Sequence, residues 1–242
     1  MAAKTEIILR NGRVYKRQVE ESHLGWINEL LDRYYDAAGN DTFYQVHLSE
    51  EMVLGLSATK VVLAGYIPGF DFSCQFRAVS LDEDEVFFVP VKSNGVEMTV
   101  AWRPPSDARC VAGYIFDRLK KYLDTAFVYM VPKELPKGED LSENLYVPEL
   151  TNIYASGNIC LGDQNRPKLG SFKLWEFRED FIHRMSTIPW NTDLFPDSIY
   201  SMAVNRWDAY GNKVDYELSD CRLASEPEEL GVIATEFLYN GG

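Results

Sequence analysis

The chain has 242 residues, of which 46% are hydrophobic, and its 24 basic and 37 acidic residues give a formal net charge of −13 at pH 7. This acidity argues against binding nucleic acid or an anionic membrane through bulk charge, because both present dense negative fields. The hydrophobic content excludes disorder as a description of the whole chain and predicts one large domain or two small ones.

Four cysteines lie at wide, irregular spacings, and they are Cys74, Cys110, Cys160 and Cys221. No two of them form a CxxC pair, so the sequence predicts neither a zinc site nor a disulfide framework. The longest apolar stretch, residues 61–67, is far shorter than the roughly 20 residues of a membrane-spanning helix. We therefore expect a reduced, soluble, cytoplasmic protein without a resident metal.

The first half of the chain is typical of a sheet protein. Leu24, Ile27, Leu30 and Leu31 recur at helical spacing, which predicts an amphipathic helix after a first strand and an Asn11-Gly12 turn. Runs of β-branched and aromatic residues predict strands at residues 5–9, 43–48, 61–67 and 70–79.

The strongest local signal is Asn94-Gly95, which predicts a hairpin between strands at residues 86–91 and 96–102. Residues 112–123 are compatible with either a helix or a strand, and residues 127–131 predict a short strand.

The second half is expected to be irregular apart from one helix. Residues 132–141 and 144–170 predict loops, and residues 172–185 predict a helix. The tail after residue 187 is expected to hold at most a strand or two. The whole pattern predicts an α+β fold with a helix first, then an antiparallel meander, a loop-built segment and a short helix.

The loop-built segment carries the clearest chemistry. Asn152 and Cys160 are eight positions apart, with a Ser156-Gly157 turn between them. This spacing can fold the Asn152 amide back towards the sulfur. When an amine attacks a thioester, an amide N–H can stabilise the developing oxyanion, a contribution of about 2.7–4 kcal/mol per donor.

This strip resembles the active-site strip of ubiquitin-conjugating enzymes. Asn152-Ile-Tyr-x-Ser-Gly-x-Ile-Cys160-Leu follows that pattern without a gap, but Leu150 and Thr151 replace the usual His-Pro pair. In ubiquitin-conjugating enzymes this His-Pro pair shapes the loop, so its replacement here concerns the conformation of the loop more than its chemistry.

A longer ordered series, over roughly residues 97–185, is similar to the prokaryotic family D of ubiquitin-conjugating-like proteins, also called PRTRC system protein B. The series is Trp102-Arg103-Pro104-Pro105-x-x-x-Arg109, Leu145-Tyr146-x-Pro148-x-x-x-Asn152, Gly157-Asn158-Ile159-Cys160-Leu161-Gly162, Trp175-Glu176-Phe177 and Phe181-Ile182-His183. This bacterial family occurs in operons with a ThiF-like activating enzyme, a ubiquitin-like protein and a JAB-type metalloprotease.

The resemblance implies a conjugating enzyme in which Cys160 accepts the ubiquitin-like protein as a thioester and passes it to an amine of a target protein. Asn152 would stabilise the oxyanion, and His183 would orient or deprotonate the nucleophile. No metal or organic cofactor is implied, because ATP is consumed by the activating enzyme. Plasmid maintenance and antiviral defence are both compatible roles.

The resemblance also implies a division of the chain. Residues 1–90 would be an N-terminal α/β extension, residues 91–190 a ubiquitin-conjugating-like core, and residues 191–242 an irregular tail with a reduced helical part.

Other readings remain open for each residue. Asn152 is also a common turn residue and His183 a common surface residue, while Cys74 and Cys110 lie in apolar runs typical of a core. One alternative function is a non-catalytic scaffold that binds a ubiquitin-like protein, favoured by the loss of the His-Pro pair. Another is a thiol hydrolase that pairs Cys160 with His183, disfavoured because the chain has only three histidines.

Overall fold

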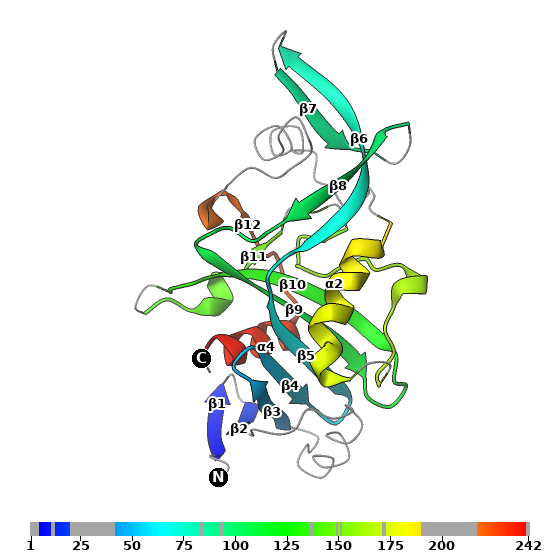
Figure 1. The fold of residues 1–242 in the computed structure, drawn as a ribbon. Coiled ribbons are helices and arrows are strands. Elements are labelled where there is room, and N and C mark those ends of the chain that lie inside the picture. Colours follow the sequence, from blue (N-terminus) through cyan, green and yellow to red (C-terminus); the bar gives the residue numbers. More distant parts are fainter. Residues whose placement is uncertain are drawn as a thin grey trace.

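The computed structural model describes residues 5–10, 13–19, 42–82, 85–91, 94–135, 138–148, 150, 152–170, 173–189 and 217–240. Within these residues the chain forms a nine-stranded sheet, a three-stranded sheet and two α-helices (Figure 1). This is a mixed fold with mainly antiparallel sheets and few helices, which is compatible with the predicted α+β class.

The large sheet contains all but three of the described strands. In spatial order they are β1 (Thr5–Arg10), β2 (Arg13–Val19), β3 (Thr42–Ser49), β4 (Met52–Leu56), β5 (Lys60–Ile67), β9 (Ala108–Asp117), β10 (Leu123–Pro132), β11 (Tyr146–Val147) and β12 (Arg222–Leu223). Neighbouring strands pair antiparallel except β2 and β3, which are parallel. Parallel strands need a crossover connection of a dozen or more residues. The helix predicted around Leu24–Leu31 and the Asn11-Gly12 turn lie outside the described residues.

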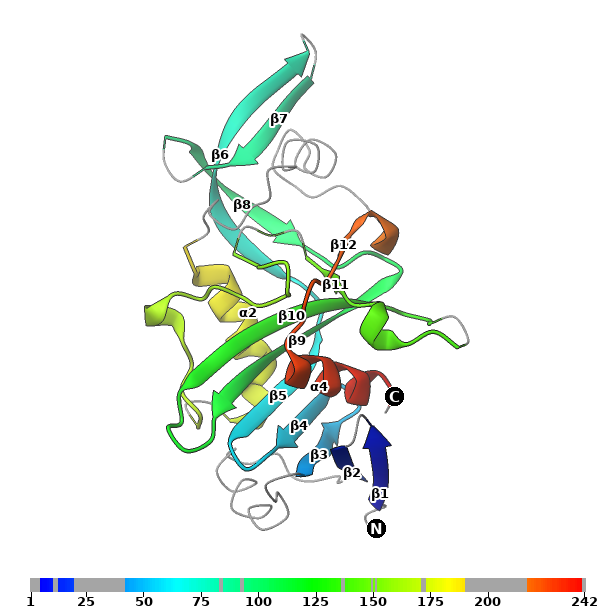
Figure 2. The same ribbon diagram turned by 180° about the vertical axis from the view of Figure 1, so that it is seen from behind.

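The central strands are buried on both faces, so their apolar residues run continuously. In β5, Val61 and Leu63 face one core, while Val62 and Ala64 face the other. Helix α2 (Phe177–Thr187) covers the first core, and α4 (Glu229–Tyr239) covers the second. The helices therefore lie on opposite faces of the sheet, as Figures 1 and 2 show from the two sides.

The hairpin predicted between residues 86–91 and 96–102 is wrong, as the small sheet shows. Strands β7 (Glu85–Pro90) and β8 (Val96–Trp102) do not pair with each other, because each pairs with the long strand β6 (Phe70–Asp82) between them. Phe76 marks the change of partner, since it lies opposite Pro90 in β7 and Val96 in β8. Asn94 does take a positive φ of 62°. A Cβ on Gly95 would lie 2.5 Å from the Phe76 carbonyl oxygen, so only glycine fits where the chain passes this close to β6.

The remaining strand predictions are largely confirmed. Each predicted strand lies within an observed one, except that β7 ends one residue earlier than expected. Residues 112–123 comprise the end of β9, a turn and the first residue of β10. Strands β2 and β4 were not predicted, and neither was β11, which lies in the segment expected to be a loop. In β4, Gly55 interrupts the strand pattern, and a Cβ there would lie 2.3 Å from the Phe43 ring, so close packing requires this glycine.

The second half of the chain is mostly irregular, as expected up to residue 170. Short 3₁₀ turns are η2 (Leu141–Glu143), η3 (Asp163–Asn165), η4 (Leu174–Glu176) and η5 (Leu218–Asp220). Helix α2 confirms the helix predicted at residues 172–185. The irregular tail predicted for residues 191–242 is wrong at residues 229–239, because α4 forms there and buries Ala234, Phe237 and Leu238 against the sheet.

Strand pairing crosses the expected division at residue 90. Strand β5, from the segment expected to be an extension, pairs along its whole length with β9 from the segment expected to be the core. No helix in the described part of the chain is long and apolar enough to cross a membrane.

Candidate active site

The strip around Cys160 folds as a small hairpin, residues 152–160, which we call the cysteine hairpin. The Cys160 N–H donates to the Asn152 carbonyl at 2.8 Å, and the Tyr154 N–H donates to the Asn158 carbonyl at 2.9 Å. At the tip, the Gly157 N–H donates back to the Tyr154 carbonyl at 2.9 Å. The predicted turn is therefore present, and it brings the two ends of the strip side by side.

The cysteine hairpin is fixed to the edge of β10. The Ile159 N–H donates to the Ala126 carbonyl at 2.8 Å, and the Val128 N–H donates to the Gly157 carbonyl at 2.9 Å. Gly157 has a φ of 84°, and a Cβ there would lie 2.3 Å from the Tyr129 ring. The approach of the hairpin to the sheet thus requires glycine at residue 157.

Cys160 is half-buried, while its neighbours Ile159 and Leu161 are buried in the core next to α2. The alternation of an extended segment explains this, because adjacent side chains point to opposite sides. Gly162 then takes φ 69° and ψ 159°, a conformation that is essentially restricted to glycine. No described residue donates a hydrogen bond to the Cys160 sulfur or accepts one from it.

Asn152 is nearly fully buried, with only 2% of its surface exposed. Its amide nitrogen donates to the carbonyl of Cys160 at 3.3 Å and to the carbonyl of Pro189, just beyond α2, at 2.9 Å. Both amide N–H groups are therefore bound to backbone carbonyls in this arrangement. Asn152 therefore contacts Cys160 at its backbone carbonyl, as the structure has it.

His183 lies on the exposed side of α2. Phe181 and Met185 are buried, and a residue two positions from each points to the opposite side of a helix. No contact in the described part of the structure joins the His183 side chain to Cys160.

Cys160 differs in burial from Cys110 and Cys221. Cys110 and Cys221 are buried, and burial raises the pKa of the Cys110 thiol far above its usual value. The Cys221 thiol donates to the Glu217 carbonyl at 3.6 Å. Cys74 lies in β6, but its side chain is not among those that the structure describes. The three cysteines whose side chains are described are free thiols, and Cys160 is the most accessible of these three.

A set of polar contacts that the sequence did not predict connects the sheet to the segment after Cys160. We call it the Arg184 network, and its members are Tyr114, Asp180, Arg184, Asn165 and Leu161. Arg184 binds both carboxylate oxygens of Asp180 at 2.8 Å and donates to the Asn165 carbonyl at 2.8 Å. The i,i+4 spacing of Asp180 and Arg184 was the available signal for the ion pair. Nothing in the sequence identified Asn165 as its neighbour.

Charge and burial act together in this network. Burial alone lowers the pKa of Arg184, but the hydrogen bond and charge of Asp180 outweigh it and raise that pKa. Burial, followed by the negative charge of Asp180, raises the pKa of Tyr114 well above its usual value. Arg184 therefore stays protonated and Tyr114 stays neutral at physiological pH.

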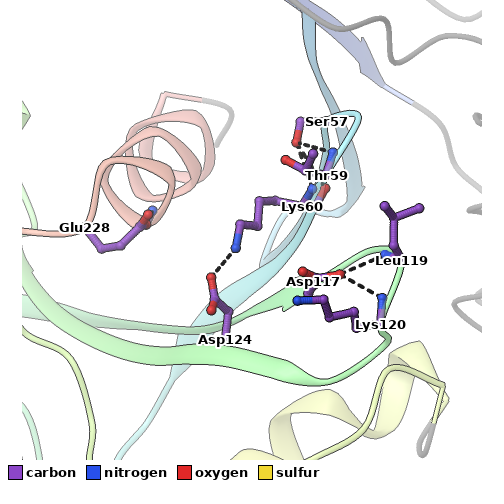
Figure 3. Close-up of polar contacts among 9 residues, drawn as sticks. Ser57, Thr59, Lys60, Asp117, Leu119, Lys120, Asp124 and Glu228 are labelled. Carbon is purple, nitrogen blue, oxygen red and sulfur yellow. Dashed lines mark hydrogen bonds and ion pairs between the residues drawn. The ribbon is translucent and has the colours of Figure 1, made fainter.

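A second polar cluster lies where β10 begins (Figure 3). Lys60 of β5 forms an ion pair with Asp124 of β10, at an irregularity where Asp124 has no partner in β9. Asp117 accepts hydrogen bonds from the N–H groups of the following turn, which lowers its pKa. Glu228 extends from the start of α4 nearby (Figure 3).

No cluster of three or more His, Cys, Asp or Glu residues within the described ranges is arranged to hold a metal ion.

No family model, curated protein or solved structure matches this chain. The resemblance to ubiquitin-conjugating-like proteins stays a prediction from the sequence.

Proposed function

We propose that this protein is a conjugating enzyme of a bacterial ubiquitin-like pathway, carrying the modifier as a thioester on Cys160. The observation that carries the proposal is the cysteine hairpin, which presents a half-buried thiol beside Asn152 and is hydrogen-bonded to β10 of the large sheet. A reactive thiol needs partial exposure, which Cys160 has and the buried Cys110 and Cys221 do not.

The arrangement around the hairpin also supports a ubiquitin-conjugating-like fold. Antiparallel strands β3, β4, β5, β9 and β10 precede the hairpin, and α2 follows it and packs on the same sheet. This is the order that the sequence pattern predicts for this part of the chain: an antiparallel meander, a loop-built segment and a short helix.

The proposed chemistry has two steps. The Cys160 thiolate attacks the thioester that joins the modifier to a cysteine of the ThiF-like activating enzyme, so that one C–S bond forms and one breaks. The released thiolate of the activating enzyme takes up a proton. An amine of the target protein then attacks the new thioester, a C–N bond forms, the amine loses a proton, and Cys160 leaves as a thiolate.

Asn152 first holds the Cys160 strip in place through its two carbonyl contacts. A role in stabilising the oxyanion requires one N–H to turn towards the thioester. The contact to the Cys160 carbonyl, at 3.3 Å, is the longer of the two and hence the easier to release.

His183 is exposed, so an incoming amine can reach it. In this proposal it meets the nucleophile from solvent and does not activate the Cys160 thiol directly. The thiol hydrolase alternative needs a histidine within hydrogen-bond reach of the sulfur, and the exposed position of His183 does not favour it.

A non-catalytic scaffold that binds a ubiquitin-like protein is the second candidate. It is favoured by two observations at the hairpin: both Asn152 N–H groups are occupied, and Leu150 is buried where the family has histidine.

The test is a charging assay with the ThiF-like enzyme, ATP and the ubiquitin-like protein expected from the same operon. We expect an adduct that excess dithiothreitol cleaves by thiol exchange at the thioester and that is absent in Cys160→Ala. Cys160→Ser should give an oxyester that resists the same thiol treatment. The matched controls Cys110→Ala, Cys221→Ala and Cys74→Ala should still be charged.

Two results decide between the candidates. If the modifier binds without forming an adduct on wild-type protein, the scaffold is supported. If the adduct survives in Cys160→Ala, the assignment of Cys160 is wrong. A JAB-type protease from the same operon, added afterwards, would show whether a conjugate formed on a target amine is reversible.

A further inference from the structure

We infer that Arg184 is a positioning residue for Cys160, acting through Asn165 and the Leu161 backbone. The importance of this role for thioester chemistry rests on the proposed function. The positioning itself rests on contacts that are independent of it.

Arg184 is itself held in place by an ion pair. It binds Asp180 with two parallel hydrogen bonds of 2.8 Å, and Asp180 accepts a third from the Tyr114 hydroxyl at 3.1 Å. Tyr114 is fully buried in β9. A guanidinium bound in this fork geometry has little freedom, so its Nη1 group also has a defined direction.

Two successive hydrogen bonds connect Arg184 to the residue that follows Cys160. The Nη1 group of Arg184 donates to the Asn165 carbonyl at 2.8 Å, and the Asn165 amide donates to the Leu161 carbonyl at 3.2 Å. Leu161 is the residue after Cys160. A continuous series of hydrogen bonds thus connects β9 through α2 to the backbone next to the Cys160 thiol.

A second chain of hydrogen bonds holds the preceding carbonyl, that of Cys160 itself. The Asn152 amide donates to the carbonyls of Cys160 and Pro189, and Pro189 lies just beyond the end of α2. The two consecutive carbonyls, of Cys160 and Leu161, are therefore each held by an asparagine amide that is connected to the end of α2. Of the side chains on α2, only Arg184 supplies such a connection through a side-chain donor in the described structure.

The experiment measures the alkylation rate of each cysteine by iodoacetamide in the intact, folded chain, with peptide mass spectrometry as the readout. The variants are Arg184→Gln, Arg184→Lys and Asn165→Ala. Lysine keeps the charge but donates from a single nitrogen, so it cannot bind Asp180 and Asn165 in the same way. The matched control is Arg178→Gln, which removes an arginine of the same helix whose ion pair is with Glu51.

We expect all three variants to raise the alkylation rate of Cys160 by about tenfold, the change that corresponds to losing one hydrogen bond of ordinary strength. Cys110 and Cys221 should stay protected, and Arg178→Gln should leave Cys160 unchanged. An unchanged Cys160 rate in Arg184→Gln would overturn the inference. So would a parallel increase at all three cysteines, because that would mean general unfolding.

The failure of the proposed function is distinguishable from this result. If wild-type protein forms no thioester, the proposed function fails, but the alkylation rates still decide the role of Arg184. If wild-type protein is charged, Arg184→Lys should lower kcat for charging with little change in KM, because the substitution acts on the backbone next to the thiol.

Discussion

Two glycines flank Cys160 for different physical reasons, and this difference is testable. Gly157 has a positive φ, and a Cβ there would also collide with the Tyr129 ring, whereas a Cβ on Gly162 would meet nothing within 4 Å. We expect Gly157→Ala to lower the free energy of unfolding by about 2–5 kcal/mol, since strain and steric overlap add. Gly162→Ala should cost only the backbone strain, about 1–2 kcal/mol.

Urea denaturation of both variants measures this difference. Equal losses of stability would contradict the close packing of Gly157 against Tyr129 and leave backbone conformation as the whole effect. The slope of the transition should be unchanged, because neither substitution alters the surface exposed on unfolding.

Asn152 has a closely matched variant in Asn152→Asp, which keeps the shape and removes both donors. The Cys160 and Pro189 carbonyls would then face carboxylate oxygens in a site that is almost fully buried. We expect stability to fall by roughly 2–5 kcal/mol at pH 7, since each buried carbonyl left without a donor costs free energy. Thermal unfolding followed by circular dichroism measures the loss. A variant as stable as wild type would mean that neither contact matters.

At the scale of single residues, the sequence predicted contacts between residues that are close in the chain. It did not predict contacts between residues that are far apart in the chain. The proximity of Asn152 and Cys160 could be predicted because a Ser-Gly turn between them is set by neighbours in the sequence. The direction of the Asn152 amide could not, because Pro189 is 37 positions away and reaches it only once α2 has packed on the sheet. The same holds for Arg184, which the sequence places beside the more conspicuous His183 and which contacts Asn165 only in the folded chain.

At the scale of elements, α4 begins at a partly buried carboxyl group, that of Glu228, whose pKa is raised. The Glu228 carboxylate accepts a hydrogen bond from the Gly231 N–H at 2.8 Å and so caps the helix. Burial raises the pKa of Glu228 above its ordinary value of 4.5, and the charges of Glu229 and Asp124 raise it further, although the N–H groups of Gly231 and Leu230 oppose this. The cap therefore binds a proton more readily in the folded state than in the unfolded chain.

The pH dependence follows from that direction. A raised carboxyl pKa means that the folded state holds more protons, so this group's contribution to stability is lost as pH rises from about 4.5 through the raised value. Glu228→Gln stays neutral, and its amide oxygen can still accept from Gly231. We therefore expect this variant to gain stability relative to wild type as the pH rises through that window, measured by urea unfolding between pH 4 and pH 8.

The neighbouring Glu229→Gln is the matched control, because Glu229 is exposed in the first turn of the same helix. It should show a smaller gain over the same pH range. A relative stability of Glu228→Gln that does not change with pH would contradict the raised pKa.

The two incorrect element predictions have separate causes. Turn chemistry at Asn94-Gly95 determines the local backbone, and Asn94 does adopt positive φ, but it does not determine which strand each arm pairs with. The 13-residue β6 is long enough to serve both arms. In α4 the β-branched residues Val232, Ile233 and Thr235 obscured a helical spacing of apolar residues that was present in the sequence, namely Leu230, Ile233, Ala234, Phe237 and Leu238.

At the scale of the whole molecule, one sheet separates two cores that differ in their relation to the candidate site. Phe181 of α2 lies in the first core, 5.5 Å from the Tyr114 ring that begins the Arg184 network. Phe237 of α4 lies in the second core, 4.1 Å from the His47 ring. Side chains on opposite faces of a sheet share few neighbours, so their effects on stability should be independent.

Phe181→Leu and Phe237→Leu test this separation as a matched pair. Each should lower the free energy of unfolding by about 1–2 kcal/mol, because each loses buried packing, and the double variant should show the sum to within about 0.5 kcal/mol. Only Phe181→Leu should change the alkylation rate of Cys160, since only the first core contains Tyr114 and supports the Arg184 network. If Phe237→Leu altered that rate equally at matched stability, the thiol would respond to overall stability, and the selective connection between α2 and Cys160 would be wrong.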